Sequence, residues 1–471
     1  MNLGKKTKIV CTIGPATESE EKLTELVNAG MNVMRLNFSH GSFTEHQARV
    51  DSIRRVIKKT GKRLAIMQDL SGPKIRIGTF KDDKITLEKG QTFTLTTEEC
   101  EGTSERVFVN YAQLPKEVKI GGAVMLQDGS KKLEIIDIKG NDIITKVIVG
   151  GVIGGKRGVN VPGADLSASS LTDKDMKDIE FGIKNKVDFM ALSFVRRPED
   201  IKELRAILDK NDSPIRIIAK IETPQAIENI DEIINVADGV MIARGDLAIE
   251  IPAEEVPLTQ KLIIHKCNSA GKPVITATQM LESMIKSPVP TRAEVSDVAN
   301  AIIDGTDAIM LSEETTLGDF PIEAVEIMTK IALRVEKDVY TRDTIAEYEE
   351  SRGITDVVSQ SAVRAAHNVG ASLIVALTRK GRVPRMLARY RPAESILVLS
   401  DKEDCLNALT LTFGCYPMLV PTLKDTCEIM DIVRSTTLGS DLVKKGDKVV
   451  IVAGMPVGAA SETNIILVET M

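Results

Sequence analysis

The stretch Ile217–Pro252, IIAKIETPQAIENIDEIINVADGVMIARGDLAIEIP, decides the fold of this chain. Two short apolar runs, Ile215–Ile221 and Gly239–Ala243, are typical of buried strands. Between them, Ala226–Val236 repeats isoleucine at helical spacing, which predicts a helix with one apolar face. The stretch is therefore predicted to form a βαβ unit with two parallel strands.

Charged residues follow both of these strands. Lys220 and Glu222 end the first strand, and Arg244 and Asp246 end the second. The carboxyl ends of neighbouring parallel strands are where barrels and open sheets place their chemistry. Glu222 and Asp246 could share a hard divalent ion, with Lys220 beside it. The alternative is that these charges only cap strands and face solvent. Because two adjacent strand ends carry one lysine and two acids between them, we favour a functional site.

Length and composition limit the class of protein. A chain of 471 residues predicts two to four domains, and a hydrophobic share of 43% is ordinary for a soluble globular protein. The net charge of -6 gives no reason to expect nucleic acid or an anionic membrane as a partner. Six scattered cysteines without a CxxC pair favour reduced thiols in a cytoplasmic protein, and no segment has the length of a membrane span.

Strand and helix patterns alternate up to Gly72, stop there, and resume at Leu171. Ser19 is a plausible N-cap of the first helix, and Gly30 and Gly61 stop the first two helices. Eight parallel strands predict a closed (β/α)8 barrel, although periodicity alone leaves an open doubly wound sheet possible. The predicted strands are residues 8–13, 33–37, 64–69, 188–193, 215–221, 239–243, 273–277 and 307–311.

The remaining residues predict two further domains. Residues 73–162 contain short alternating runs separated by turn signals, which predicts an inserted antiparallel β domain. After residue 341, a helix over Val357–Asn368 and strands at 373–377, 395–399 and 448–454 predict a smaller α/β domain. We therefore expect a TIM (β/α)8 barrel (1–72 and 163–340), an inserted β-barrel lid domain (73–162) and a C-terminal three-layer α/β domain (341–471).

Polar side chains follow seven of the eight predicted strands. Arginines that can grip phosphate, carboxylates for a divalent ion and a lysine for developing charge suit phosphoryl chemistry. The chain has no Walker loop, no Rossmann glycine fingerprint and no Ser-His or Cys-His signature. The residues at these strand ends are Arg35, Asn37, Ser39, Asp69, Ser193, Arg196, Lys220, Glu222, Arg244, Asp246, Thr278, Gln279, Ser312, Glu313 and Glu314.

Several longer motifs carry a resemblance that spans essentially the whole chain. They are TKIVCTIGPAT, MNVMRLNFSHG, SGPKIR, GVNVPG, IIAKIE, DGVMIARGDL, TATQMLESM, PTRAEVSDVANAIIDGTDAIMLS and SETN. With these motifs the sequence resembles the pyruvate kinase family. The resemblance implies a barrel, a β lid and a C-terminal effector domain, and transfer of a phosphoryl group from phosphoenolpyruvate to ADP, giving pyruvate and ATP.

The resemblance also implies roles for individual residues. Glu222 and Asp246 would hold Mg²⁺ or Mn²⁺, and Lys220 would stabilise the phosphoryl group and the enolate as they separate. Arg35 would grip the phosphate, and Thr278 would lie near the enolate face that receives a proton. The substrate carboxylate would meet the backbone amides of Ala243, Arg244, Gly245 and Asp246. The nucleotide and cation region would include Asn37, Ser39, His40, Arg76 and Lys156.

Two departures from the family pattern concern a monovalent cation. Leu70 replaces the usual threonine ligand of potassium, and Lys74 replaces a glutamate. Family members with this pair are of the potassium-independent kind, which implies that the Lys74 ammonium substitutes for the cation close to Asn37, Ser39 and Asp69. The alternative is that Lys74 points to solvent at the hinge of the lid. A third departure is Glu313, where the family usually has glycine.

The C-terminal domain carries a basic loop, Thr378-Arg379-Lys380-Gly381-Arg382, between a strand and a helix. We expect it to bind a small phosphorylated effector, with a solvated charge run as the alternative. Val383 replaces the usual serine or threonine, which favours a monophosphate over a doubly phosphorylated sugar. The resemblance also implies a homotetramer.

Other interpretations remain open from the sequence. The chain could be a barrel lyase or aldolase that acts on a phosphoenolpyruvate-like acid, or a catalytically silent metabolite sensor. Arg244 is expected to be a structural ion-pair partner, His40 could cap the following helix, and Thr278 could be a buried hydroxyl bonded to backbone. Asp128 could reach the site or only turn a hairpin.

Overall fold

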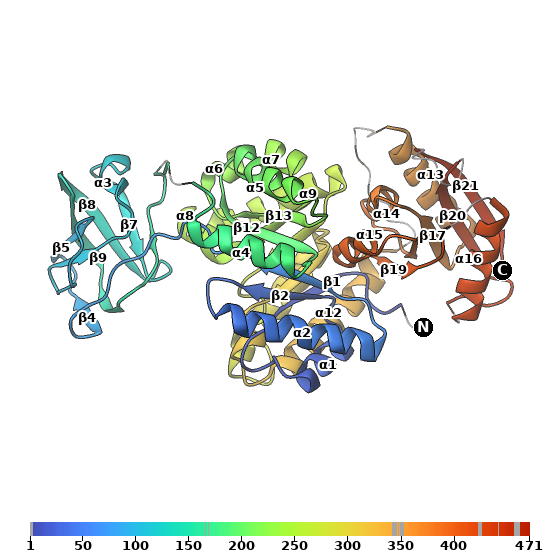
Figure 1. The fold of residues 1–471 in the computed structure, drawn as a ribbon, viewed down its shortest axis with the longest axis horizontal. Coiled ribbons are helices and arrows are strands. Elements are labelled where there is room, and N and C mark those ends of the chain that lie inside the picture. Colours follow the sequence, from blue (N-terminus) through green and yellow to red (C-terminus); the bar gives the residue numbers. More distant parts are fainter. Residues whose placement is uncertain are drawn as a thin grey trace.

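The computed structural model describes residues 3–164, 166–167, 169–341, 346, 348, 353–422, 426–440, 442–455 and 462–471. Ser461 of the SETN motif lies outside these residues. The chain forms three units in a row, with the barrel between the inserted β domain and the C-terminal domain (Figure 1). No helix of the described part is long and apolar enough to cross a membrane.

Eight parallel strands close into a barrel in the order β1-β16-β15-β14-β13-β12-β3-β2. The predicted barrel is therefore confirmed, and the open sheet is excluded. Each strand is fully or almost fully buried, because helices cover the outside and side chains fill the inside. The strands are β1 (Lys8–Thr12), β2 (Val33–Asn37), β3 (Ala65–Asp69), β12 (Phe189–Val195), β13 (Arg216–Ile221), β14 (Gly239–Ala243), β15 (Val274–Ala277) and β16 (Ala308–Leu311).

Helices surround the barrel, and their ends follow the predicted signals. Ser19 caps α1 through its side chain, and Gly61 ends α2 in the left-handed conformation that glycine adopts without strain. The helices of this unit are α1 (Glu20–Ala29), α2 (Phe43–Thr60), α4 (Asp173–Lys184), α5 (Pro198–Lys210), α6 (Pro224–Glu228), α7 (Ile230–Val236), α8 (Arg244–Glu250), α9 (Val256–Ala270), α10 (Arg292–Ile303), α11 (Glu313–Thr316) and α12 (Pro321–Val339). Short 3-10 turns lie at Ala253–Glu255 and Glu282–Ile285.

The helix predicted over Ala226–Val236 is two helices, so this prediction is wrong in detail. α6 begins at Pro224, capped by Thr223, and the chain leaves helical geometry at Asn229. The side-chain amide of Asn229 donates to the carbonyl oxygen of Arg196 at 2.9 Å. This bond to the loop after β12 competes with helix continuation, as asparagine side chains commonly do.

The inserted domain is built almost entirely of β-structure. A six-stranded sheet has the order β11-β7-β8-β9-β5-β6, and β10 pairs with β4. All pairs are antiparallel except β5 with β6. Its elements are β4 (Lys84–Leu87), β5 (Thr92–Thr96), β6 (Arg106–Phe108), α3 (Leu114–Glu117), β7 (Ala123–Leu126), β8 (Lys131–Lys139), β9 (Asp142–Val149), β10 (Gly151–Gly154) and β11 (Val159–Asn160).

The C-terminal domain is a five-stranded sheet, β19-β18-β17-β20-β21, with an apolar core on each face. The three-layer prediction is therefore confirmed, although the sequence patterns missed β19 and β21, and α13 begins three residues before the predicted helix. The elements are α13 (Ile354–Val369), β17 (Leu373–Leu377), α14 (Arg382–Ala388), β18 (Ser395–Ser400), α15 (Glu403–Ala408), a 3-10 turn (Leu409–Leu411), β19 (Cys415–Leu419), α16 (Thr426–Gly439), β20 (Lys448–Gly454) and β21 (Thr463–Thr470).

Candidate active site

Lys220 is the centre of a polar cluster at the carboxyl ends of the barrel strands. Its ammonium lies 3.2 Å from Asp69 Oδ1, 2.9 Å from Glu222 Oε1 and 2.7 Å from the hydroxyl oxygen of Ser193. Burial disfavours the charged form, but the carboxylates of Asp69 and Glu222 outweigh burial and hold the pKa of Lys220 above its ordinary value. The lysine is therefore a fixed positive charge at neutral pH.

Asp69 connects this lysine to Arg35. The Arg35 Nε atom donates to Asp69 Oδ2 at 2.7 Å, and a terminal nitrogen donates to Thr12 at 2.8 Å. Burial would raise the pKa of Asp69, but Arg35 and Lys220 outweigh burial and hold it below its ordinary value. Two buried cations thus share the ionised carboxylate of Asp69, and Lys220 also pairs with Glu222.

Glu222 has a carboxylate oxygen without a hydrogen bond. Its Oε2 atom accepts the backbone N–H of Phe194 at 2.7 Å, and Phe194 is turned to this position by a left-handed φ of 55°. Its buried Oε1 atom makes the ion pair with Lys220 but no hydrogen bond. Burial, with Asp246 nearby, raises the pKa of Glu222, so a further cation would favour the ionised form.

Asp246 lies in the first turn of α8 and meets the inserted domain. Lys74 places its ammonium 3.5 Å from Asp246 Oδ1 and 3.8 Å from Asp128 Oδ1. Asp128 therefore reaches the rim of the site, and Lys74, whose side chain is 25% exposed, faces two carboxylates instead of open solvent. The inserted domain also contacts α8 through Asn160, which donates to Glu250 at 2.8 Å.

Glu222 and Asp246 fit the ligand chemistry of a magnesium-like ion. The ion takes one or two carboxylates and completes its shell with water and substrate oxygens. The described residues contain no group of three acidic, histidine or cysteine side chains that could hold a metal alone. The unbonded Oε1 atom of buried Glu222 is the donor that such an ion would use.

Thr278 has a strained backbone at the end of β15. Its φ is 71°, a left-handed value that is unusual for a β-branched residue and typical of functional sites. Its hydroxyl oxygen accepts the N–H of Gly245 at 2.7 Å and donates to the carbonyl of Ala277 at 2.5 Å. The bond to backbone considered from the sequence is present, and it links β15 to the start of α8.

Arg244 is a structural residue in this arrangement. Its two terminal nitrogens form a bidentate ion pair with Asp297 of α10, each at 2.7 Å. One of these nitrogens also donates to the carbonyl oxygen of Thr278 at 2.8 Å. The side chain therefore holds α8, α10 and the loop after β15 together, as expected from the sequence.

The predicted nucleotide residues divide between barrel and inserted domain. Asn37 accepts the backbone N–H of Ser39 at 3.1 Å, and His40 is exposed. His40 does not cap α2, because Ser42 does so in a capping box with Glu45. In the inserted domain, half-buried Arg76 donates to the carbonyl of Lys156 at 3.2 Å, so these two residues are neighbours.

The C-terminal basic loop is partly neutralised. Arg379 pairs with Asp401 at 3.0 Å, and the hydroxyl of Thr378 accepts the N–H of Gly381 at 2.9 Å. Lys380 and Arg382 are exposed. Val383 is buried in the apolar core, so it offers nothing to a ligand.

Two residues of the site had no predicted role. Ser193 was noted only as a polar residue at a strand end, yet it bridges Lys220 and the carbonyl of Leu70, to which it donates at 2.7 Å. Thr12, the partner of Arg35, ends the one predicted strand to which no polar group was assigned. Position at a strand end was the available signal for both.

A buried lysine, a paired arginine and two carboxylates at one barrel end define a phosphoryl-transfer enzyme.

The chain belongs to the pyruvate kinase family, since the family's barrel domain matches residues 4–325 and its alpha/beta domain matches residues 356–469. A pyruvate kinase of Geobacillus stearothermophilus is 48% identical over 472 residues, covering 99% of this chain and 80% of that relative. One of Bacillus licheniformis is 47% identical over 469 residues, covering 98% and 80%. The crystal structure of a Cryptosporidium parvum pyruvate kinase has a TM-score of 0.94 at 36% identity, covering 99% of this chain and 96% of that one.

Membership of this family shows which class of enzyme the protein belongs to. The protein is a phosphotransferase whose substrates and products are those of the family: phosphoenolpyruvate, pyruvate and the ADP/ATP pair. The lyase and sensor interpretations are not supported by the family match.

Proposed function

We propose that the barrel end around Lys220 transfers the phosphoryl group of phosphoenolpyruvate to ADP. The observation that carries the proposal is the Lys220 ammonium, buried and held by Asp69, Glu222 and Ser193. In the reaction the bond between phosphorus and the enol oxygen breaks, and a β-phosphate oxygen of ADP bonds to phosphorus. A coupled assay of ATP formation from phosphoenolpyruvate and ADP tests the proposal, and absence of ATP would reject it.

The cationic residues would act on the phosphate and the developing enolate. Arg35 has its Nε atom on Asp69, which orients the guanidinium so that it can hold a phosphate oxygen. Lys220 would stabilise negative charge on the oxygen that leaves phosphorus, without rearranging, because three partners already fix its ammonium.

Glu222 and Asp246 would hold Mg²⁺ or Mn²⁺ through carboxylate oxygens. When bound, the ion supplies positive charge that offsets the charge of the substrate oxygens. The family generally needs a divalent metal, and the unbonded Glu222 Oε1 atom supports this assignment.

The carboxylate of the substrate would lie at the start of α8, near Ala243, Arg244, Gly245 and Asp246. The N–H of Gly245 is bonded to Thr278, so substrate binding there would share or replace this bond. Thr278 would then be released close to the enolate, consistent with a role in its protonation. Asn37, His40, Arg76 and Lys156 would contact the nucleotide between barrel and lid.

We predict that the enzyme does not need potassium. Leu70 is fully buried in the barrel core and offers no oxygen, and Lys74 is directed at Asp246 and Asp128. A tethered ammonium a few ångströms from phosphate would supply the field of a monovalent ion. Activity should be near its maximum in a buffer with a bulky organic counter-ion and neither sodium nor potassium, measured by initial rates.

The matching variant is Lys74→Glu, which places a carboxylate beside Asp246. It should lower activity about tenfold or more, and added potassium should restore part of the loss. Lys89→Glu, an exposed change in the same domain, is the control and should have no effect. A wild-type enzyme that needs potassium for most of its activity would contradict the role of Lys74.

We further predict that the loop Thr378–Arg382 binds a phosphomonoester effector. Lys380 and Arg382 are exposed, and Arg379 is paired with Asp401. A sugar monophosphate or AMP should shift the phosphoenolpyruvate concentration for half-maximal rate several-fold, and Arg382→Gln should remove the shift. A screen in which no such compound changes the saturation curve would reject the site.

The wider assignments follow from the family. We propose a cytoplasmic homotetramer, with the barrel formed by residues 1–72 and 163–340, the lid by 73–162 and the effector domain by 341–471. Neither nucleic acid nor a membrane is proposed as a partner.

A further inference from the structure

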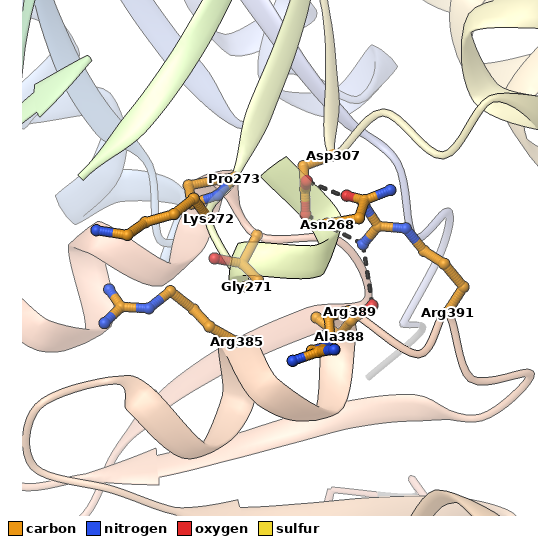
Figure 2. Close-up of a pocket in the computed structure, with 10 residues that line it drawn as sticks. Asn268, Gly271, Lys272, Pro273, Asp307, Arg385, Ala388, Arg389 and Arg391 are labelled. Atoms are coloured by element: carbon orange, nitrogen blue, oxygen red, sulfur yellow. Dashed lines mark hydrogen bonds and ion pairs between the residues drawn. The ribbon is translucent and has the colours of Figure 1, made fainter. Parts of the chain in front are cut away.

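A narrow crevice lies between the amino-terminal end of the barrel and the C-terminal domain. The loop from α9 to β15 contributes Lys272, and α14 with the residues after it contributes Arg385, Arg389 and Arg391. Its cavity volume is about 10 Å³, enough for one water-sized group. Figure 2 shows Lys272 and Arg385 extending to the same side of the crevice, whereas Arg391 is held against Asp307.

The carboxylates near this crevice are already used. Asp307 lies 3.0 Å from Arg391 and accepts backbone N–H groups from Phe413 at 2.9 Å and Val274 at 3.1 Å. Asp238 pairs with Arg205 and Arg216, and it accepts the N–H of Ile217 at 2.9 Å. Both acids are therefore already paired with arginines, and neither accepts a hydrogen bond from Lys272 or Arg385.

Of the crevice cations, Arg385 lacks an acceptor, whereas Lys272 and Arg389 each have one partner. Among the described residues, the Arg385 side chain has no hydrogen bond or ion pair, and Lys272 donates only to the carbonyl of Ala237, at 2.6 Å. Arg389 is buried; it pairs with Asp356 at 3.1 Å and lies over the rings of Tyr348 and Tyr390, although none of its guanidinium nitrogens makes a hydrogen bond. Arg385 and Lys272 are half-buried and make no hydrogen bond to a carboxylate of the described residues, so an anion at the mouth of the crevice could accept from both.

Charge supports the same conclusion. Burial lowers the pKa of Arg385, and neighbouring Arg216 lowers it further. Burial likewise lowers the pKa of Lys272, with Asp238 opposing and Arg385 adding to the effect. These cations repel one another at the junction of two domains, so a bound anion would stabilise the junction.

We propose that this crevice binds a phosphate group, either as inorganic phosphate or as a small phosphomonoester. One oxygen would enter the crevice, where there is room for a single water-sized group, and the others would meet Arg385 and Lys272 at its mouth. A tetrahedral dianion suits the position because its oxygens accept in several directions and the donors come from two domains. This site is separate from the loop Thr378–Arg382 and from the barrel end around Lys220.

Isothermal titration calorimetry of the 471-residue protein tests the proposal. Inorganic phosphate and glycerol 2-phosphate are titrated separately at constant ionic strength, without substrate or nucleotide. We expect saturable binding that Arg385→Gln and Lys272→Gln each weaken about tenfold or more, because one charge-assisted contact is lost. Arg364→Gln, an exposed change on α13, should keep the wild-type affinity.

The outcomes separate the possible sources and sites. Binding of both compounds supports a site open to phosphomonoesters, and binding of inorganic phosphate alone supports a closed site. Equal affinity in wild type and in a folded Arg385→Gln or Lys272→Gln variant would overturn the proposal, as would the absence of saturable binding. Loss of binding in Arg382→Gln but not in Arg385→Gln would assign the anion to the effector loop and also overturn it.

Discussion

Replacing Lys220 by methionine should lower kcat about 10²- to 10³-fold, the loss typical of one missing stabiliser of transition-state charge. The methionine keeps much of the side-chain volume but removes the ammonium that pairs with both Asp69 and Glu222. Because negative charge grows on the enol oxygen as its bond to phosphorus breaks, the lost interaction matters most in the transition state.

The kinetic constants distinguish this role from simple substrate binding. We expect kcat and kcat/KM to fall together, measured by the coupled assay at saturating and limiting phosphoenolpyruvate. Lys202→Met, an exposed lysine on α5, is the control and should retain full activity. A folded Lys220→Met enzyme with normal kcat and only a raised KM would show that the lysine serves binding alone.

The barrel could be predicted because its signals are local. Apolar runs such as Gly239–Ala243 are buried on both faces, so the pattern in the sequence matches the strand observed. Helix stop signals are local as well, since Gly61 ends α2 at its own position in the chain. The site followed from the barrel, because closure brings the residues after each strand to one end.

Elements at edges and contacts between distant residues were not predictable. β21 pairs on one side only and is mostly half-buried or exposed, so its pattern does not stand out as a core strand. The break at Asn229 depends on a bond to Arg196, more than thirty positions earlier in the chain. The pairs of Ser193 with Lys220 and of Arg244 with Asp297 likewise arise only when the helices and strands are in place.

The second prediction with a large expected effect concerns metal binding by Glu222 and Asp246. Glu222→Ala and Asp246→Ala should each weaken binding of Mn²⁺ by at least about 100-fold, because changes to residues that only support metal ligands already cost 10- to 100-fold. Binding is measured directly, by electron paramagnetic resonance of free Mn²⁺, so the result does not depend on turnover.

The geometry explains why two carboxylates should be enough and why neither can be spared. Glu222 is buried, its Oε1 atom pairs with Lys220 but makes no hydrogen bond, and burial with Asp246 nearby raises its pKa, so a divalent charge would favour its ionised form. Asp246 is shared with Lys74 at 3.5 Å, and removing it leaves that ammonium facing Asp128 alone. Glu254→Ala, an exposed acid just beyond α8, should leave Mn²⁺ affinity unchanged. If both site variants bind Mn²⁺ as tightly as the wild type, the metal lies elsewhere and the role assigned to this pair is wrong.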